Sequence, residues 1–177
     1  MKGCLGRTGL YISAFCLTLQ GAPVLAQQAA GPQQPIVAEV FQSWTFRCFS
    51  GTHARCELFQ SRIDPRTKQP LFWVEYTRYA AGKVQIAVIT PLGSRVTDGV
   101  SMTIDGKFSW STPIKSCLPV GCLSNIDANK VFLDRIRRGS TLTANVTTMA
   151  GEKVSLQLSL AGFDKGLTRL EAHFNSR

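Results

Sequence analysis

Apolar residues recur at every second position through most of the chain, which is the period of a strand with one buried face. Trp44, Phe46 and Cys48 share one side of such a strand, and polar residues occupy the other side. Residues 71–76 are rich in aromatic and β-branched side chains, which also favours a strand. The pattern therefore predicts a chain built mainly of strands.

The same alternation returns in the second half of the chain. Its apolar members are Val84, Ile86 and Val88, then Val100, Met102 and Ile104, then Leu142, Ala144 and Val146, and finally Val154, Leu156, Leu158 and Leu160. Asp105-Gly106 has the composition of a two-residue hairpin turn that leads into Phe108 and Trp110. About seven short strands with one apolar face predict two antiparallel sheets packed face to face.

One short helix is expected between these strands. Its apolar residues at near-helical spacing are Val131, Leu133 and Ile136. Asp127 is the expected N-cap, and Gly139 is expected to end the helix in a left-handed conformation. Residues 167–173 predict either a second helix or a last edge strand. The fold class is therefore an all-β antiparallel sandwich with one or two short helices.

The N-terminus has the layout of a secretory signal peptide. Lys2 and Arg7 precede an apolar stretch over residues 9–19, which is shorter than the roughly 20 residues that span a bilayer. Small residues then lead to a cleavage position after Ala26. We expect a signal peptide over 1–26, with an uncleaved anchor as the alternative, and hence a periplasmic or secreted protein.

The rest of the chain is expected to form one basic domain. Residues 27–39 predict a flexible polar lead-in, and residues 40–177 a single domain. Removal of Lys2 and Arg7 lowers the formal net charge from +9 to +7. A positive excess favours anionic partners such as lipid headgroups, acidic polysaccharide or acidic proteins, although it also serves solubility alone.

The cysteines that remain after cleavage are even in number, as expected for disulfides in an exported chain. They are Cys48, Cys56, Cys117 and Cys122. Their short separations favour two local loops, and crossed pairing between the two groups stays open. A zinc site is disfavoured, because paired zinc cysteines usually stand two to four residues apart and the first pair is wider.

The sequence offers little for catalysis. His53 and His173 stand apart from each other, and neither has a carboxylate at metal-ligand spacing. Nucleophile-elbow, phosphate-loop and dinucleotide motifs are absent from the sequence. We therefore predict no cofactor, no metal and no enzymatic activity; an enzyme would have to use His53, His173 or Glu75.

Two groups of basic residues are candidates for binding an anionic partner, with a merely solvated face as the alternative. They are Arg47, Arg55, Arg62, Arg66 and Lys68 in the first group, and Arg135, Arg137 and Arg138 in the second. No nucleic-acid-binding motif accompanies them, so a nucleic-acid partner is not predicted, whereas peripheral membrane contact is compatible with them. Trp44, Trp73 and Trp110 are expected to fill the core.

Several segments in a fixed order resemble the invasion-associated locus B family of exported proteins of Gram-negative bacteria. The segments are residues 44–48, 56–60, 90–93, 99–106, 117–122 and 159–163. The resemblance implies a periplasmic or surface-associated immunoglobulin-like sandwich that is associated with invasion of host cells in some pathogens. It also implies the pairs Cys48–Cys56 and Cys117–Cys122, and it supplies no catalytic residue.

Together these features predict an exported, non-catalytic binding protein whose partner is an acidic component of the envelope or of a host surface. A periplasmic structural or chaperone-like protein that receives another chain by strand addition is the first alternative. An envelope hydrolase is the second alternative.

Overall fold

The computed structural model describes residues 34–175 except 53, 69, 80, 81, 83 and 128. The predicted signal peptide and most of the predicted lead-in lie outside this part, as does His53. The larger of its two sheets contains β1 (Val37–Phe41), β2 (Trp44–Phe49), β3 (Arg55–Ile63), β4 (Pro70–Tyr79), β5 (Val84–Thr90), β8 (Ile114–Leu118) and β9 (Gly121–Ile126). The smaller contains β6 (Val100–Ile104), β7 (Phe108–Thr112), β10 (Thr141–Thr147) and β11 (Lys153–Ser159).

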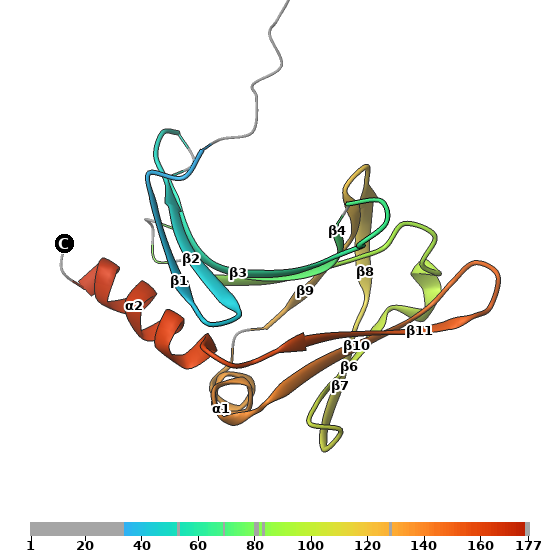
Figure 1. Ribbon diagram of the computed structural model, residues 1–177. Helices are drawn as coiled ribbons and strands as arrows, with labels where there is room; N and C mark the ends of the chain where they lie inside the picture. Colours follow the sequence, from blue (N-terminus) through green and yellow to red (C-terminus); the bar gives the residue numbers. More distant parts are fainter. Residues whose placement is uncertain are drawn as a thin grey trace, which may run out of the picture. The chain divides into compact units, whose positions relative to one another are not determined.

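Every pairing between these strands is antiparallel. The order in the larger sheet is β1-β2-β3-β4-β5-β9-β8, and the order in the smaller sheet is β11-β10-β6-β7. Figure 1 shows that β2 and β3 are strongly bent, with the smaller sheet on their convex side. The prediction of an all-β sandwich with short helices is confirmed.

Alternating residues of both sheets form one apolar core, as their spacing predicted. Trp44, Phe46 and Leu58 are fully buried in the larger sheet, and Met102 and Leu142 are fully buried in the smaller one. Core-facing residues occupy every second position of these strands because successive side chains of a strand point to opposite faces. The period-two pattern therefore identified the core face correctly.

The predicted hairpin turn between β6 and β7 is also confirmed. Asp105 has φ 53° and Gly106 has φ 65°, so both central residues are left-handed. Left-handed conformations at both central residues suit the twist of the flanking strands. The connection spans residues 105–107, because Ile104 pairs with Phe108. The Asp105 carboxylate then accepts hydrogen bonds from the backbone N–H groups of Ser140 (3.0 Å) and Thr141 (2.8 Å), which joins this turn to the start of β10.

The C-terminal segment is a helix rather than an edge strand. This helix, α2 (Phe163–Asn175), packs on the core face of β1, β2 and β3. The Trp44 and Phe163 rings meet edge to face at 4.9 Å, and Trp44 Nε1 donates a 3.0 Å hydrogen bond to the Ser159 carbonyl. Among the described residues, no helix is long and apolar enough to cross a membrane.

The shorter helix, α1 (Lys130–Arg138), differs from its prediction at both ends. Its N-cap is Asn129, which accepts a 2.9 Å hydrogen bond from the Phe132 N–H, and not Asp127. Gly139 has φ −80°, so the left-handed ending was wrong. Glycine is needed there for space, because a β-carbon would collide with the side chains of Ile104 and Leu160.

Further details depart from the sequence-based expectations. β1 begins at Val37, inside the stretch expected to be a flexible lead-in, because Val37 pairs with Cys48. The described residues hold eleven strands where about seven were expected. A third helical segment, the 3-10 turn η1 (Val96–Asp98), precedes β6. Trp44 fills the core as expected, whereas Trp73 and Trp110 are only half-buried.

Candidate ligand-binding pocket

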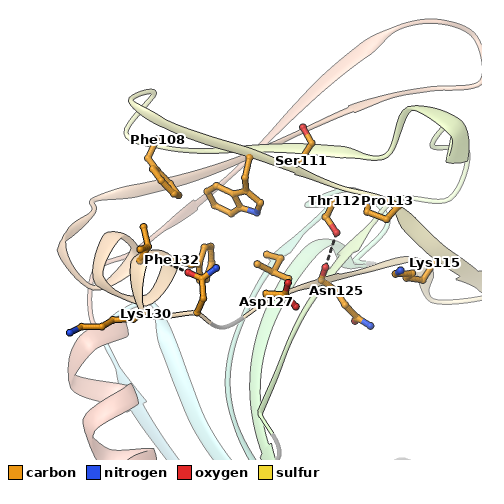
Figure 2. Close-up of a pocket in the computed structure, with 13 residues that line it drawn as sticks. Phe108, Ser111, Thr112, Pro113, Lys115, Asn125, Asp127, Lys130 and Phe132 are labelled. Atoms are coloured by element: carbon orange, nitrogen blue, oxygen red, sulfur yellow. Dashed lines mark hydrogen bonds between the residues drawn. The ribbon is translucent and has the colours of Figure 1, made fainter.

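A cavity of about 740 Å³ opens on the flank of the sandwich (Figure 2). It lies where β7, the edge strand of the smaller sheet, faces β9 and the connection that leads into α1. The Thr112 hydroxyl spans the two sheets here by donating a 2.7 Å hydrogen bond to the Asn125 carbonyl. The cavity therefore exists because the two sheets diverge at this flank and α1 closes one end of the gap.

Aromatic side chains form the inner wall of the cavity. Trp110 of β7 meets Phe132 of α1 edge to face at 4.9 Å, and its ring lies 5.6 Å from that of Phe108. The Trp110 indole nitrogen is buried and has no acceptor among the described residues. A buried donor without a partner costs about 1–3 kcal/mol. An acceptor on a bound molecule would relieve that cost.

The rim of the cavity is polar and carries two lysines. Lys115 comes from β8, and Lys130 is the first residue of α1. No acidic residue stands in the first turn of α1, although carboxylates are the residues that stabilise the positive end of a helix. Lys130 therefore costs the helix some stability while it raises the positive potential at the cavity mouth. Asp127 also lines the rim and offsets part of this charge.

A second hollow, of about 430 Å³, adjoins this cavity, and Phe108 lines both. It carries Lys107, Arg135 and Arg138, and the Arg135 guanidinium lies 5.5 Å from the centre of the Phe108 ring. We call the exposed cations around the two cavities the α1 surface. They are Lys107, Lys115, Lys130, Arg135 and Arg138. Cations beside aromatic faces suit an anionic ligand that also has a flat apolar side.

Comparison with known proteins decides the family. The family model described as invasion associated locus B (IalB) protein matches residues 44–171. The chain belongs to the IalB family. Invasion protein B homologs of two Brucella abortus strains, 2308 and the biovar 1 strain 9-941, are each 26% identical over 163 residues, covering 91% of this chain and 88% of theirs.

A crystal structure of invasion associated protein b from Bartonella henselae has the same fold as this IalB-family chain. The TM-score is 0.71 at 23% identity, and the alignment covers 79% of this chain and 98% of that one. At this identity the similarity extends to the fold alone. The match to the family model confirms the family resemblance noted from six sequence segments.

The first predicted basic group does not form one patch. Arg47 and Arg55 lie on the face of the larger sheet opposite the core, where both bind Glu57. Arg47 Nε donates to Glu57 at 2.6 Å and Arg55 Nε at 3.2 Å, and Glu57 is fully buried. A buried carboxylate needs such partners, so these two arginines are structural in the first place.

The other members of that group are separated from Arg47 and Arg55. Arg62 stands at an even-numbered position of β3, on the opposite face from Arg55. Arg66 and Lys68 lie in the turn between β3 and β4, at the other end of β3. The alternation of a strand thus divides residues that are neighbours in sequence.

The second predicted group is partly brought together. Arg135 and Arg138 are exposed and belong to the α1 surface. Arg137 turns toward α2 instead, with its guanidinium 3.1 Å from the Asp164 carboxylate and 3.4 Å from that of Glu171. Arg137 therefore joins the two helices and contributes little positive potential to the surface.

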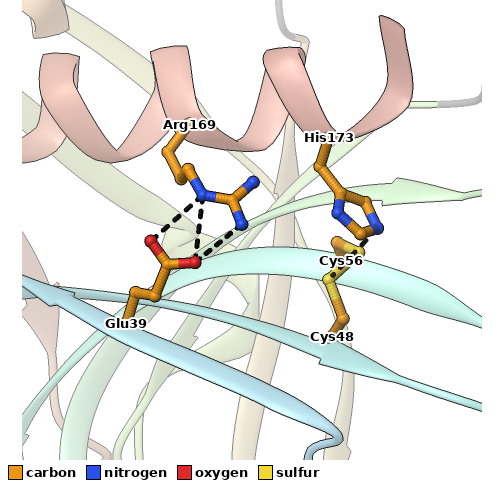
Figure 3. Close-up of polar contacts among 5 residues, drawn as sticks. All are labelled: Glu39, Cys48, Cys56, Arg169 and His173. Carbon is orange, nitrogen blue, oxygen red and sulfur yellow. Dashed lines mark hydrogen bonds and ion pairs between the residues drawn. A yellow bond between two sulfur atoms is a disulfide. The ribbon is translucent and has the colours of Figure 1, made fainter. Parts of the chain in front are cut away.

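Both disulfides occur in the local pairing, Cys48–Cys56 and Cys117–Cys122. His173 Nε2 lies 3.8 Å from the Cys48 sulfur (Figure 3). The imidazole also contacts the rings of Phe46 and Phe174 edge to face. The three side chains Cys48, Cys56 and His173 are close enough to hold a metal, but the disulfide ties up the two thiolates that such a site needs.

Glu75 has an unusual environment on the sheet face opposite the core. Burial, first of all, and repulsion from Glu57 raise the pKa of its carboxyl, Arg47 and Arg55 lower it, and the net result is a pKa of about 7. Such a pKa suits a general base. Its neighbours across the strands, Phe59 and Ala87, supply no second reactive group.

Sequence reasoning missed most of the cavity. Trp110 was assigned to the core and Asp127 to a helix cap, whereas both line the cavity, and Lys115 and Lys130 were not singled out. The available signal was Lys130, a cation at the start of a predicted helix. The rest of the cavity depends on which strand lies at the edge of the sheet, and a single strand pattern does not contain that information.

Proposed function

We propose that this IalB-family protein is exported and binds, without catalysing a reaction, an anionic component of the bacterial envelope or of a host surface. The ligand occupies the aromatic cavity beside α1 and pairs with the cations of the α1 surface. The observation that carries the proposal is the combination of an apolar cavity with exposed cations on its rim. Most ligand sites have this composition, a largely apolar pocket with a few polar groups that fix orientation.

Electrostatics supports an anionic ligand. The four cations Lys107, Lys130, Arg135 and Arg138 stand within or beside one nine-residue helix and the neighbouring hairpin. These cations outnumber the carboxylates of Asp105 and Asp127, which line the same two cavities, and an excess of one sign of charge attracts counter-ions and accelerates association. The ring of Phe108, which both hollows share, would stack on the apolar face of a sugar or a similar flat group.

Export is supported by the N-terminal sequence and by two disulfides within one small domain. The related Brucella proteins bear the name invasion protein B homolog. A role in virulence, with the protein in the periplasm or at the cell surface, is accordingly part of this proposal.

Charge reversal tests the proposal with heparin as an acidic polysaccharide probe. The variant Lys130→Glu/Arg135→Glu should bind heparin at least about tenfold more weakly, because two rim charges are inverted. The control variant Lys165→Glu/Lys153→Glu changes the net charge equally at exposed positions outside the α1 surface. It should lose little affinity at physiological salt.

Equal losses in both variants would show that heparin senses only net charge, and the proposed site would be wrong. Trp110→Phe provides a second readout. It should abolish any heparin-induced change in tryptophan fluorescence, because Trp110 lines the cavity, Trp44 is fully buried, and Trp73 of β4 does not line the cavity.

A second candidate function, strand addition, is favoured by one observation. Within the part of the chain that the structure describes, β7 pairs only with β6 and β8 only with β9, so both strands present a free edge at the same flank. An extended peptide could pair with such an edge. Binding of that kind should be insensitive to salt, whereas binding at the α1 surface should weaken steeply as salt rises.

A further inference from the structure

Exposed apolar side chains gather at one end of the sandwich. Nine large hydrophobic side chains are exposed in the described part of the chain, and six of them lie at this end. The six are Ile63, Leu92, Val96, Leu118, Val120 and Met149. Single exposed apolar residues are ordinary on protein surfaces, whereas a concentration of them marks an interaction site.

The strand register places these residues together. The connections over residues 64–69, 91–99 and 119–120 leave the same end of the larger sheet, since Ile63 pairs with Pro70, Trp73 with Ile89, and Thr90 with Cys122. The turn over 148–152 joins them, because the Met149 N–H donates 2.8 Å to the Gly93 carbonyl. We call these four connections, together with the strand ends that flank them, the loop end; it lies on the right in Figure 1.

The loop end is also basic. Its cations are Arg62, Arg66, Lys68, Arg95 and Lys153, and its carboxylates are Asp64, Asp98 and Glu152. Asp64 is mostly buried and accepts backbone hydrogen bonds from Arg66 (2.8 Å) and Thr67 (3.4 Å), so it stabilises its own turn. Arg95 also lies 3.8 Å from the Asp98 carboxylate, so the five cations and three carboxylates leave this end with a net charge of +2 beside its apolar side chains.

The most prominent tip is held rigidly. Leu118 and Val120, which are 51% and 62% exposed, flank Pro119 in the turn between β8 and β9. The Cys117–Cys122 disulfide closes this turn. Gly121, with φ +141°, has no room for a β-carbon against Ile89 and the Thr90 carbonyl, so the turn lies close on β5. A rigid tip loses little conformational entropy when it is buried.

From these observations we infer that the loop end docks on an anionic lipid bilayer, with Leu118 and Val120 inserted among the headgroups and acyl chains. The charge complements anionic headgroups, and basic residues near such a surface add to the attraction one by one. The apolar residues stand on four separate connections or on the strand ends that flank them, with cations among them, as in Arg62-Ile63. The core of a protein–protein interface would instead be contiguous and depleted of charge. This surface is distinct from the α1 surface.

Vesicle co-sedimentation tests the inference, with protein purified from cells that express the full-length sequence. The probes are vesicles of phosphatidylcholine alone and of phosphatidylcholine mixed with phosphatidylglycerol. We expect binding to the mixed vesicles, and Leu118→Ser/Val120→Ser should weaken it at least about tenfold. The control Val40→Ser, at a 73% exposed valine of β1, should leave it unchanged.

A charge pair of variants separates specific contact from net charge. Arg66→Glu should weaken binding to the mixed vesicles several-fold more than Lys165→Glu does. The second variant alters the net charge by the same amount, but on α2. The tip variant should still bind heparin as the unmodified protein does, so this test stands apart from that of the proposed function. Unchanged vesicle binding by the tip variant would overturn the inference. A second result would also overturn it. If the unmodified protein does not bind vesicles but binds one defined envelope protein, and the tip variant loses that binding, the partner is a protein.

Discussion

Arg169 on α2 holds Glu39 on β1 in a two-pronged ion pair, with Nη2 2.7 Å and Nε 3.0 Å from the carboxylate oxygens (Figure 3). The same guanidinium lies 4.8 Å from the centre of the Phe46 ring. Among the described strands, β1 lies at the edge of its sheet and pairs only with β2. The ion pair therefore gives this edge a second attachment, through the C-terminal helix.

A double-mutant cycle should measure this attachment. Arg169→Gln and Glu39→Gln should each lower the free energy of unfolding, with a coupling of about 1 kcal/mol, because the geometry is bidentate but both side chains are partly exposed. Urea unfolding of the two single variants and the double variant provides the measurement. Strictly additive losses would contradict the account, and Lys165→Gln serves as the helix-surface control.

Gly166→Ala should destabilise the protein although alanine favours helices. The propensity gain is about 1 kcal/mol, whereas forcing a methyl into a packed core costs about 1–3 kcal/mol. The added β-carbon would collide with the side chain of Leu58, which is fully buried and cannot move away. Urea unfolding should therefore show a lower free energy of unfolding for Gly166→Ala than for the unmodified protein.

The double variant Gly166→Ala/Leu58→Ala provides the matching test. Its loss should be smaller than the sum of the two single losses, because the shortened Leu58 leaves room for the new methyl. A stabilising effect of Gly166→Ala by itself would show that the helix does not lie as close to β3 as described.

The elements that sequence analysis placed correctly are those whose burial alternates. β6, β10 and β11 bury every second residue, so period two alone identifies their core face. β8 exposes four of its five residues, which leaves no alternation to detect. Strands held by pairing and a disulfide rather than by burial are therefore invisible to a hydrophobic pattern.

The candidate cavity could not have been predicted for a related reason. Phe108 and Trp110 were correctly placed on one strand after the Asp105-Gly106 turn. Aromatic rings on one face of a strand are expected to be buried in the core. The sheet order makes β7 the last strand, so these rings border a gap instead of a further strand. Which strand forms an edge depends on long-range pairing and not on local pattern.

Glu75 should make the protein less stable as the pH rises. Burial, first of all, and the Glu57 carboxylate raise its pKa to about 7 from an ordinary value of 4.5. Between these two values the folded state binds more protons than the unfolded state, so stability falls with increasing pH and levels off above pH 7. Glu75→Gln should remove this fall and stabilise the protein by about 2 kcal/mol at pH 8.

Unfolding curves at pH 5 and pH 8 measure the effect. The exposed Glu152→Gln variant is the control and should keep the pH dependence of the unmodified protein. If Glu75→Gln and the unmodified protein lose equal stability between the two pH values, Glu75 is not the group responsible.

The two disulfides should contribute differently to stability. Loss of Cys48–Cys56 opens the longer loop and also leaves space in the core, because both sulfurs are buried beside His173. The loss of loop closure lowers the free energy of unfolding by about 2–3 kcal/mol, and the space left by the two sulfur atoms lowers it further. Loss of Cys117–Cys122 involves a shorter loop, with Cys117 exposed, and should cost about 2 kcal/mol.

Denaturant unfolding of the two double-alanine variants gives these values. A larger loss for Cys117→Ala/Cys122→Ala than for Cys48→Ala/Cys56→Ala would contradict the packing described for α2. Cys117→Ala/Cys122→Ala should also bind anionic vesicles more weakly, since the turn that carries Leu118 and Val120 is then no longer closed by a disulfide.

The indole N–H signals in a nitrogen–proton correlation spectrum test the proposed site most directly. The protein has three tryptophans, and of these Trp110 lines the cavity beside α1. Titration with heparin should shift the Trp110 indole signal together with the backbone amides of Lys130 and Arg135, and leave the buried Trp44 indole in place. Shifts confined to Arg47, Arg55 and Arg66, with the Trp110 indole unmoved, would contradict binding at this cavity.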